Sequence, residues 1–93
     1  MQNGKYHTLD VKKRCEDKLD IKFRSGSEFN GWFWLDGKRA ARVTVPKGRK
    51  PVPRGTYSSM AKQLKISVHD FDEFMDCPLT LEKYIKILKA KGI

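Results

Sequence analysis

Hydrophobic and polar residues alternate through the middle of the chain in the way typical of strands. Residues 29–35 and 39–45 are rich in aromatic and β-branched side chains, which suit a half-buried sheet surface. Asp36-Gly37 between them is a strong hairpin signal. Residues 20–24 form a shorter alternating run that leads into a Gly-Ser turn. We therefore expect three consecutive antiparallel strands.

The hydrophobic pattern also selects the register of the hairpin. A two-residue loop would pair Leu35 with Lys38 and Phe33 with Ala40. A three-residue loop, which adds Lys38 to the turn, pairs Phe33 with Ala41 and brings apolar residues together along one face. Because one face must be buried, we expect the three-residue loop. The opposite, open face would then carry Asn30, Trp32, Trp34, Ala40, Arg42 and Thr44.

Two segments that flank the strands have the periodicity of amphipathic helices. Residues 8–19 carry apolar residues at four-residue spacing, and Thr8 or Asp10 can cap their start. A second helix is expected after Thr56 as its N-cap. The predicted buried stripes are Val11, Cys15 and Leu19 in the first helix and Tyr57, Met60, Ala61 and Leu64 in the second.

Two shorter helices are predicted after residue 66. Ser67 caps the first, with Asp70 at the capping-box position. Thr80 caps the second, and Gly92 ends it. The predicted apolar sides are Val68, Phe71, Phe74 and Met75 in the first and Leu81, Tyr84, Ile85 and Leu88 in the second.

The order of elements predicts an α+β fold. An α-β-β-β-α arrangement, followed by two C-terminal helices, gives a three-stranded antiparallel sheet with helices on one face. Ninety-three residues make one domain, with a core over about residues 8–66 and a helical extension over residues 67–93. The chain shows neither an apolar run long enough to span a membrane nor the apolar part of a signal peptide. We therefore expect a soluble cytoplasmic protein with no membrane partner.

The positive charge is concentrated in one third of the chain. The net charge is +9, and residues 37–69 contain no Asp or Glu. Outside that segment, eleven Lys and Arg balance eleven Asp and Glu. A polyanion such as nucleic acid is the expected partner, and the alternative is a basic surface that only aids solubility. The nine cations of the segment are Lys38, Arg39, Arg42, Lys47, Arg49, Lys50, Arg54, Lys62 and Lys65.

A basic loop follows the third strand. Residues 47–54 carry four positive charges, and Pro46, Pro51 and Pro53 are expected to stiffen the loop and to prevent regular strand pairing. An ordered loop loses less entropy on binding than a flexible one. Trp32 and Trp34 offer a stacking surface beside it. The predicted phosphate contacts are Arg42, Lys47, Arg49, Lys50, Arg54 and Lys62.

The remaining reactive residues indicate neither a metal site nor a cofactor. Cys15 and Cys77 lie far apart without a CxxC or histidine partner, so we expect two small buried hydrophobic residues and no disulfide or zinc site. His7 and His69 are expected to be solvated. The acids between residues 70 and 76 lack the spacing of a calcium loop and are expected on a solvated helix face.

Residues 61–67, with Phe71 and Phe74, resemble a helix-turn-helix in which Lys65 replaces the usual glycine of the turn. The second helix is acidic, and acidic side chains would repel a phosphate backbone. We therefore expect DNA to be a less suitable partner than RNA. The acidic face could instead bind the basic surface of a partner or of a second copy.

A series of motifs lies within about residues 10–66. In chain order the motifs are Phe23-Arg24-Ser25-Gly26-Ser27, the Asp-Gly hairpin, Val43-Thr44-Val45-Pro46, the basic loop and Arg54-Gly55-Thr56-Tyr57. Their order and spacing resemble the HicA family, small toxins of toxin–antitoxin pairs. The resemblance implies a dsRBD-like α-β-β-β-α fold, mRNA cleavage, and a HicB-like antitoxin partner that covers the RNA-binding surface.

Glu28 stands where the family has its catalytic histidine. The family motif is Gly-Ser-His, and this chain has Gly26-Ser27-Glu28. Histidine suits RNA cleavage because it exchanges protons near neutral pH. A glutamate would need a pKa raised by burial, whereas a basic neighbourhood has the opposite effect. Glu28 is thus the candidate catalytic residue by position, and the alternative is a polar strand-edge residue in an ion pair.

Three functions stay open at this point. The first is a HicA-like RNA-binding protein, with or without endoribonuclease activity. The second is a non-catalytic module that binds RNA or DNA. The third is a protein-interaction domain that uses the Trp32 and Trp34 face of the sheet.

Overall fold

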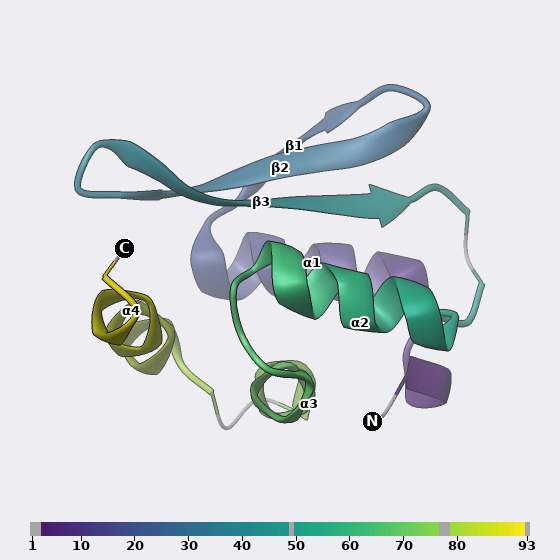
Figure 1. Cartoon of the computed structure of the whole chain (residues 1–93). Helices are drawn as coiled ribbons and strands as arrows, with labels where there is room; N and C mark the ends of the chain where they lie inside the picture. Colours follow the sequence, from purple (N-terminus) through teal and green to yellow (C-terminus); the bar gives the residue numbers. More distant parts are fainter. Residues whose placement is uncertain (1–2, 49, 77–78, 93) are drawn as a thin grey trace.

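The structure is a computed structural model of the 93-residue chain and describes residues 3–48, 50–76 and 79–92. It is an α+β fold in which three antiparallel strands, in the order β1-β2-β3, form one open sheet. Figure 1 shows α1 and α2 beneath the sheet, α3 below them and α4 under the tip of the β2–β3 hairpin. The predicted α+β class and antiparallel sheet are confirmed. The elements are a short 3-10 helix (Asn3–Lys5), α1 (Thr8–Leu19), β1 (Lys22–Ser25), β2 (Glu28–Leu35), β3 (Lys38–Pro46), α2 (Arg54–Gln63), α3 (Val68–Asp76) and α4 (Leu81–Ala90).

The hairpin keeps the predicted register but not the predicted turn. Leu35 pairs with Lys38, so the loop has two residues, and the predicted three-residue loop is wrong. Asp36 and Gly37 both have positive φ, 53° and 79°, as a two-residue hairpin turn requires. Phe33 nevertheless pairs with Ala41, as the buried face demands.

A β-bulge reconciles the short turn with that register. Trp34 pairs with Arg39 and Phe33 pairs with Ala41, so Ala40 is one extra residue on β3. Ala40 is buried, which corrects its predicted place on the open face. Because cross-strand partners share a face of the sheet, Arg39 takes that place beside Trp34.

Gly31 allows β1 to pack closely on β2. It pairs with Phe23. A Cβ atom at position 31 would lie 2.4 Å from Cγ2 of Ile21 and 2.9 Å from Cδ1 of Phe23. No side chain tolerates contacts that short without displacement of its neighbours.

The first helix, α1, spans the predicted residues 8–19 with a different N-cap, whereas α2 begins earlier than the sequence predicts. His7, rather than Thr8 or Asp10, is the N-cap of α1, and its N–H donates to Oδ2 of Asp10 over 2.8 Å. Pro53, rather than Thr56, precedes α2, and proline suits this position because it has no N–H to leave unpaired.

The starts of the last two helices and of β1 complete the comparison. Ser67 Oγ accepts the Asp70 N–H over 3.1 Å, and Thr80 Oγ1 accepts the Lys83 N–H over 3.3 Å, so both predicted caps are confirmed. The first strand begins at Lys22 rather than at residue 20, because Asp20 ends α1 with a left-handed φ of 53°.

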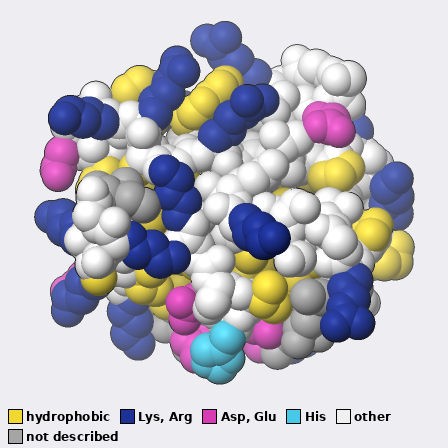
Figure 2. All heavy atoms as spheres, viewed as in Figure 1, with side chains coloured by type: hydrophobic (Ala, Val, Ile, Leu, Met, Phe, Trp, Pro, Cys, Tyr) yellow, Lys and Arg dark blue, Asp and Glu magenta, His cyan; other side chains and the backbone are white. Residues whose placement is uncertain are grey.

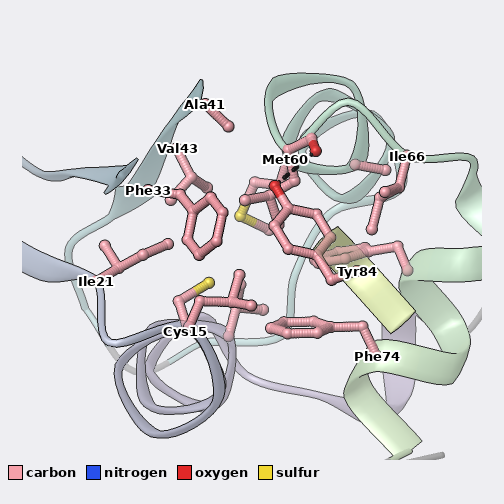
Figure 3. Close-up of a cluster of buried hydrophobic side chains, with 14 of the residues drawn as sticks. Cys15, Ile21, Phe33, Ala41, Val43, Met60, Ile66, Phe74 and Tyr84 are labelled. Atoms are coloured by element: carbon pink, nitrogen blue, oxygen red, sulfur yellow. Dashed lines mark hydrogen bonds between the residues drawn. The ribbon is translucent and has the colours of Figure 1, made fainter. Parts of the chain in front are cut away.

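One hydrophobic core joins all the layers. Side chains from the sheet, both central helices, α3 and α4 meet in a single cluster (Figure 3). Within it, the rings of Phe33 and Tyr84 lie 5.0 Å apart, and the Tyr84 hydroxyl donates to the Leu64 carbonyl over 2.9 Å. Cys15 is fully buried, and burial raises the pKa of its thiol to about 12. Cys77, its predicted counterpart, lies outside the described residues.

The N-terminal segment holds the basic loop in place. Thr8 N–H donates to the Lys50 carbonyl over 3.0 Å, and Val52 N–H donates to the Tyr6 carbonyl over 3.1 Å. His7 and Pro51 thus form an isolated antiparallel bridge. Apart from this one bridge, the described residues of the loop form no strand, which agrees with the expectation that its prolines prevent regular strand pairing.

Candidate nucleic-acid interface

Arginine and tryptophan side chains alternate on the open face of the sheet. The Arg39 guanidinium lies 4.9 Å from the centre of the Trp32 ring and 5.4 Å from that of Trp34. The Arg42 guanidinium lies 5.8 Å from the Trp32 ring. We call Trp32, Trp34, Arg39 and Arg42 the Arg–Trp ladder. Such cation–π contacts hold each cation against a ring while its N–H groups can still donate to an anion.

Hydrogen bonds fix one end of the Arg–Trp ladder. Arg42 Nη2 donates to Oδ1 of Asn30 over 3.1 Å, and the Thr44 hydroxyl donates to the same oxygen over 2.8 Å. The Thr44 N–H donates to Oε1 of Gln63 over 2.9 Å, which ties the outer edge of β3 to α2. Arg42 is therefore positioned by both a ring and an amide.

A groove extends from the Arg–Trp ladder to the end of α2. It has a volume of about 420 Å³, and its described lining contains four cations and no acidic side chain. Lys62 comes from the last turn of α2, and Lys65 follows with a left-handed φ of 63°. The groove could hold a polyanion with its backbone along the cations and a flat group against Trp32. The lining residues are Trp32, Arg39, Ala40, Ala41, Arg42, Lys62, Gln63 and Lys65.

The structure divides the predicted phosphate contacts into two groups. Trp32, Arg42 and Lys62 meet in the groove, and Trp34 is more than half exposed above it, at 57%. Lys47, Lys50 and Arg54 are exposed at the far end of β3 and the first turn of α2. Lys47 Nζ lies 5.3 Å from the Phe29 ring. Arg49 lies outside the described residues.

Glu28 occupies the edge of a separate open hollow of about 500 Å³, beside the start of α2. Its side chain is exposed, and within the described residues it forms no ion pair or side-chain hydrogen bond. Thr56, Ser59 and Gln63 line the hollow with it. Among the described lining residues no second titratable group stands opposite Glu28, so an acid–base pair is not assembled there.

The acidic side chains of α3 lie away from the sheet. Figure 2 shows Asp and Glu gathered low in the view, over α3, while Lys and Arg side chains lie over the sheet and α2. The Asp72 carboxylate accepts a hydrogen bond from the Tyr57 hydroxyl over 2.5 Å, and the Asp76 carboxylate accepts one from Nζ of Lys5 over 3.0 Å. Burial and the bond to Asp72 raise the pKa of Tyr57. On α3, Nε2 of His69 lies 3.0 Å from Oε1 of Glu73. Part of the acidic face is thus engaged in contacts within the molecule.

Within the described part of the chain, three or more His, Cys, Asp or Glu side chains nowhere gather closely enough to hold a metal ion. No described helix has the length and apolar character needed to cross a bilayer. Known family models, curated proteins and solved structures provide no match to this chain. The HicA resemblance therefore stays a prediction.

Two residues of the candidate interface were not predicted from the sequence. Arg39 and Lys65 line the groove, although neither is among the six cations predicted to contact phosphates. In the predicted register Arg39 faces the core side, opposite Leu35. Only the bulge at Ala40 brings it to the open face, and the periodicity of the sequence contains no signal for a bulge.

Proposed function

We propose that the protein binds RNA through the Arg–Trp ladder and the adjoining groove. The observation that carries the proposal is the interleaving of two guanidiniums with two tryptophan rings on an open sheet face. Aromatic faces stack on bases of any sequence, and cations beside them neutralise phosphates. The absence of acids from residues 37–69 supports the same conclusion.

We further propose that the protein is a HicA-like, dsRBD-like member of a toxin–antitoxin system with a HicB-like partner. The element order from α1 to α2 and the placement of both helices on one face of the sheet support this assignment. The loop group of Lys47, Lys50 and Arg54 would add phosphate contacts at the start of α2. RNA is a better partner than DNA because α3 presents carboxylates where a recognition helix would lie.

Binding is tested by titrating the protein with fluorescein-labelled single-stranded RNA at several salt concentrations. The two tryptophans of the chain both lie in the Arg–Trp ladder, so RNA should also quench the intrinsic fluorescence. With about five phosphate contacts, the logarithm of the association constant should fall with the logarithm of salt at a slope of about −3.5. Arg39→Ala and Arg42→Ala should each reduce that slope by about 0.7.

Lys13→Ala is the matched control, because Lys13 is exposed on α1, beneath the opposite face of the sheet. It should leave the slope unchanged. Binding that does not respond to salt, or an equal loss in the control and the arginine variants, would contradict the proposal. Chain cleavage is followed in the same mixtures on denaturing gels. We expect intact RNA, because Glu28 lacks a described acid–base partner; fragments that disappear with Glu28→Gln would instead make Glu28 catalytic.

A further inference from the structure

The edge of β2 opposite β3 is only partly covered. β1 pairs with β2 from Ser25 opposite Phe29 to Lys22 opposite Trp32. Before Lys22 the chain turns away at Asp20 into α1. Residues 33–35 of β2 therefore pair with β3 on one side and with no described strand on the other.

Trp34 directs its backbone groups toward this open edge. The Thr44 N–H donates to Gln63 of α2, so it points away from β2. In an antiparallel pair the direction of backbone groups alternates along each strand. The backbone N–H and C=O of Asn30, the partner of Thr44, therefore point away from β3. The backbone groups of Trp32 and Trp34, two and four residues further along β2, point the same way. Trp32 meets Lys22 of β1, whereas Trp34 lies beyond the end of β1.

An apolar hollow lies directly beside the open edge. It has a volume of about 470 Å³ and runs between the tip of the hairpin and α4. Leu19, Phe33 and Leu35 line it from above and from the side of α1, and Leu81 and Ile85 line it from α4. Trp34 and Leu81, the large hydrophobic side chains that stand out as exposed among the described residues, at 57% and 41%, both line it.

A strand edge beside an apolar hollow fits one kind of occupant. An extended peptide supplies the N–H and C=O that Trp34 needs, and its alternate side chains enter the hollow. A nucleic acid has no backbone amide to offer. A second copy would have to overcome repulsion between two chains of net charge +9.

Charge selects the composition of the peptide. Lys22 lines the hollow, and Lys38 and Arg39 lie opposite Leu35 and Trp34. The described lining itself carries two acids, Asp20 and Asp36, beside Lys22, so the net charge of +9 on the whole molecule is what favours an acidic segment. We propose that an extended, acidic segment of another protein, with alternating apolar residues, adds to the β2 edge at Trp34 and fills the hollow beside α4.

The test pans displayed random peptides of about ten residues, an ordinary upper length for a strand, against the full chain. Enriched sequences should alternate apolar and acidic residues. As synthetic peptides they should slow hydrogen exchange at the Trp34 amide. Leu81→Gln should weaken their binding by at least about tenfold, since it removes much of the apolar contact. Ala90→Gln, an exposed substitution on the same helix, should not.

The proposal is overturned if no peptide enriches, if the enriched peptides bind Leu81→Gln as tightly as the parent chain, or if they protect other amides and leave Trp34 unprotected. This inference does not depend on RNA binding. Leu81 is absent from the Arg–Trp ladder and the groove, so Leu81→Gln should bind RNA with the parent affinity, and failure of one proposal is distinguishable from failure of the other.

Discussion

Single residues decide how closely the layers of this protein approach one another. Gly31 lets Ile21 and Phe23 pack against β2 where any side chain would collide. Ala40 adds the one residue that turns Arg39 toward Trp34. Neither residue carries chemistry of its own, yet the first permits the core and the second completes the Arg–Trp ladder.

Gly31→Ala should therefore destabilise the fold. The new Cβ would lie 2.4 Å from Cγ2 of Ile21, and relief of such overpacking typically costs about 1–3 kcal/mol. Urea denaturation measures the change. Gly55→Ala is the matched control, because its Cβ meets nothing within 4 Å and lies inside α2. The control should keep or raise the stability, by about 0.5–1 kcal/mol; equal losses in both variants would refute the close-packing argument.

At the scale of elements, the contact between β3 and α2 protects a strand edge. β3 ends the sheet on one side, and unpaired edges invite association with other chains. The Gln63 side chain accepts a hydrogen bond from the Thr44 N–H, which would otherwise be unpaired at this edge. Two positions further on, Pro46 has no N–H to offer. The same contact holds β3 beside the helix that supplies Lys62 to the groove.

Gln63→Ala should remove this protection. The loss of one partly buried hydrogen bond costs about 1 kcal/mol, and the Thr44 amide should exchange with solvent faster. Gln63→Glu keeps an acceptor oxygen and should preserve most of the protection. Amide exchange followed by NMR checks both variants. Unchanged exchange at Thr44 in Gln63→Ala would mean that the side-chain bond does not form in solution.

At the scale of the whole molecule, the C-terminal helices share the core of the sheet. Phe71, Phe74, Tyr84 and Leu88 are all buried in the cluster that contains Phe33 and Val43. Tyr84 both contacts the Phe33 ring and donates to α2. The sequence predicts residues 67–93 to be an extension of a core over residues 8–66, and stability measurements can test that division.

A chain that ends at residue 66 should not fold. Loss of one large buried side chain costs about 3–5 kcal/mol, several are lost together, and a domain has only about 5–15 kcal/mol in total. Circular dichroism and NMR dispersion of the truncated chain provide the measurement. Tyr84→Phe in the full chain, which keeps the ring and loses the hydroxyl bond, should cost only about 1 kcal/mol. A cooperative unfolding transition in the truncated chain would instead show that the residues up to 66 form a core of their own.

The sequence predicts most of the fold because its strongest signals are periodic. The apolar stripes of α1 and α2 and the buried face of the hairpin follow from spacing alone, and all four stripe residues of α2 are buried. The N-cap of α1 at His7 and the early start of α2 after Pro53 were missed, because neither is a typical capping residue. Of the predicted contact residues, Trp32, Arg42 and Lys62 lie together in the groove. Arg39 and Lys65 required the bulge and the turn after α2, which depend on tertiary packing.

Because of the bulge at Ala40, the number of residues in the hairpin can change without a change in which residues lie on each face of the sheet. If position 40 were absent, Lys38 would still meet Leu35, Arg39 would still meet Trp34 and Ala41 would still meet Phe33, now as an uninterrupted ladder. One codon can thus be gained or lost there without reversing the two faces of the sheet. In evolutionary terms, the tip of this hairpin is where we expect descendants of the gene to differ in length while they retain the alternation of arginine and tryptophan.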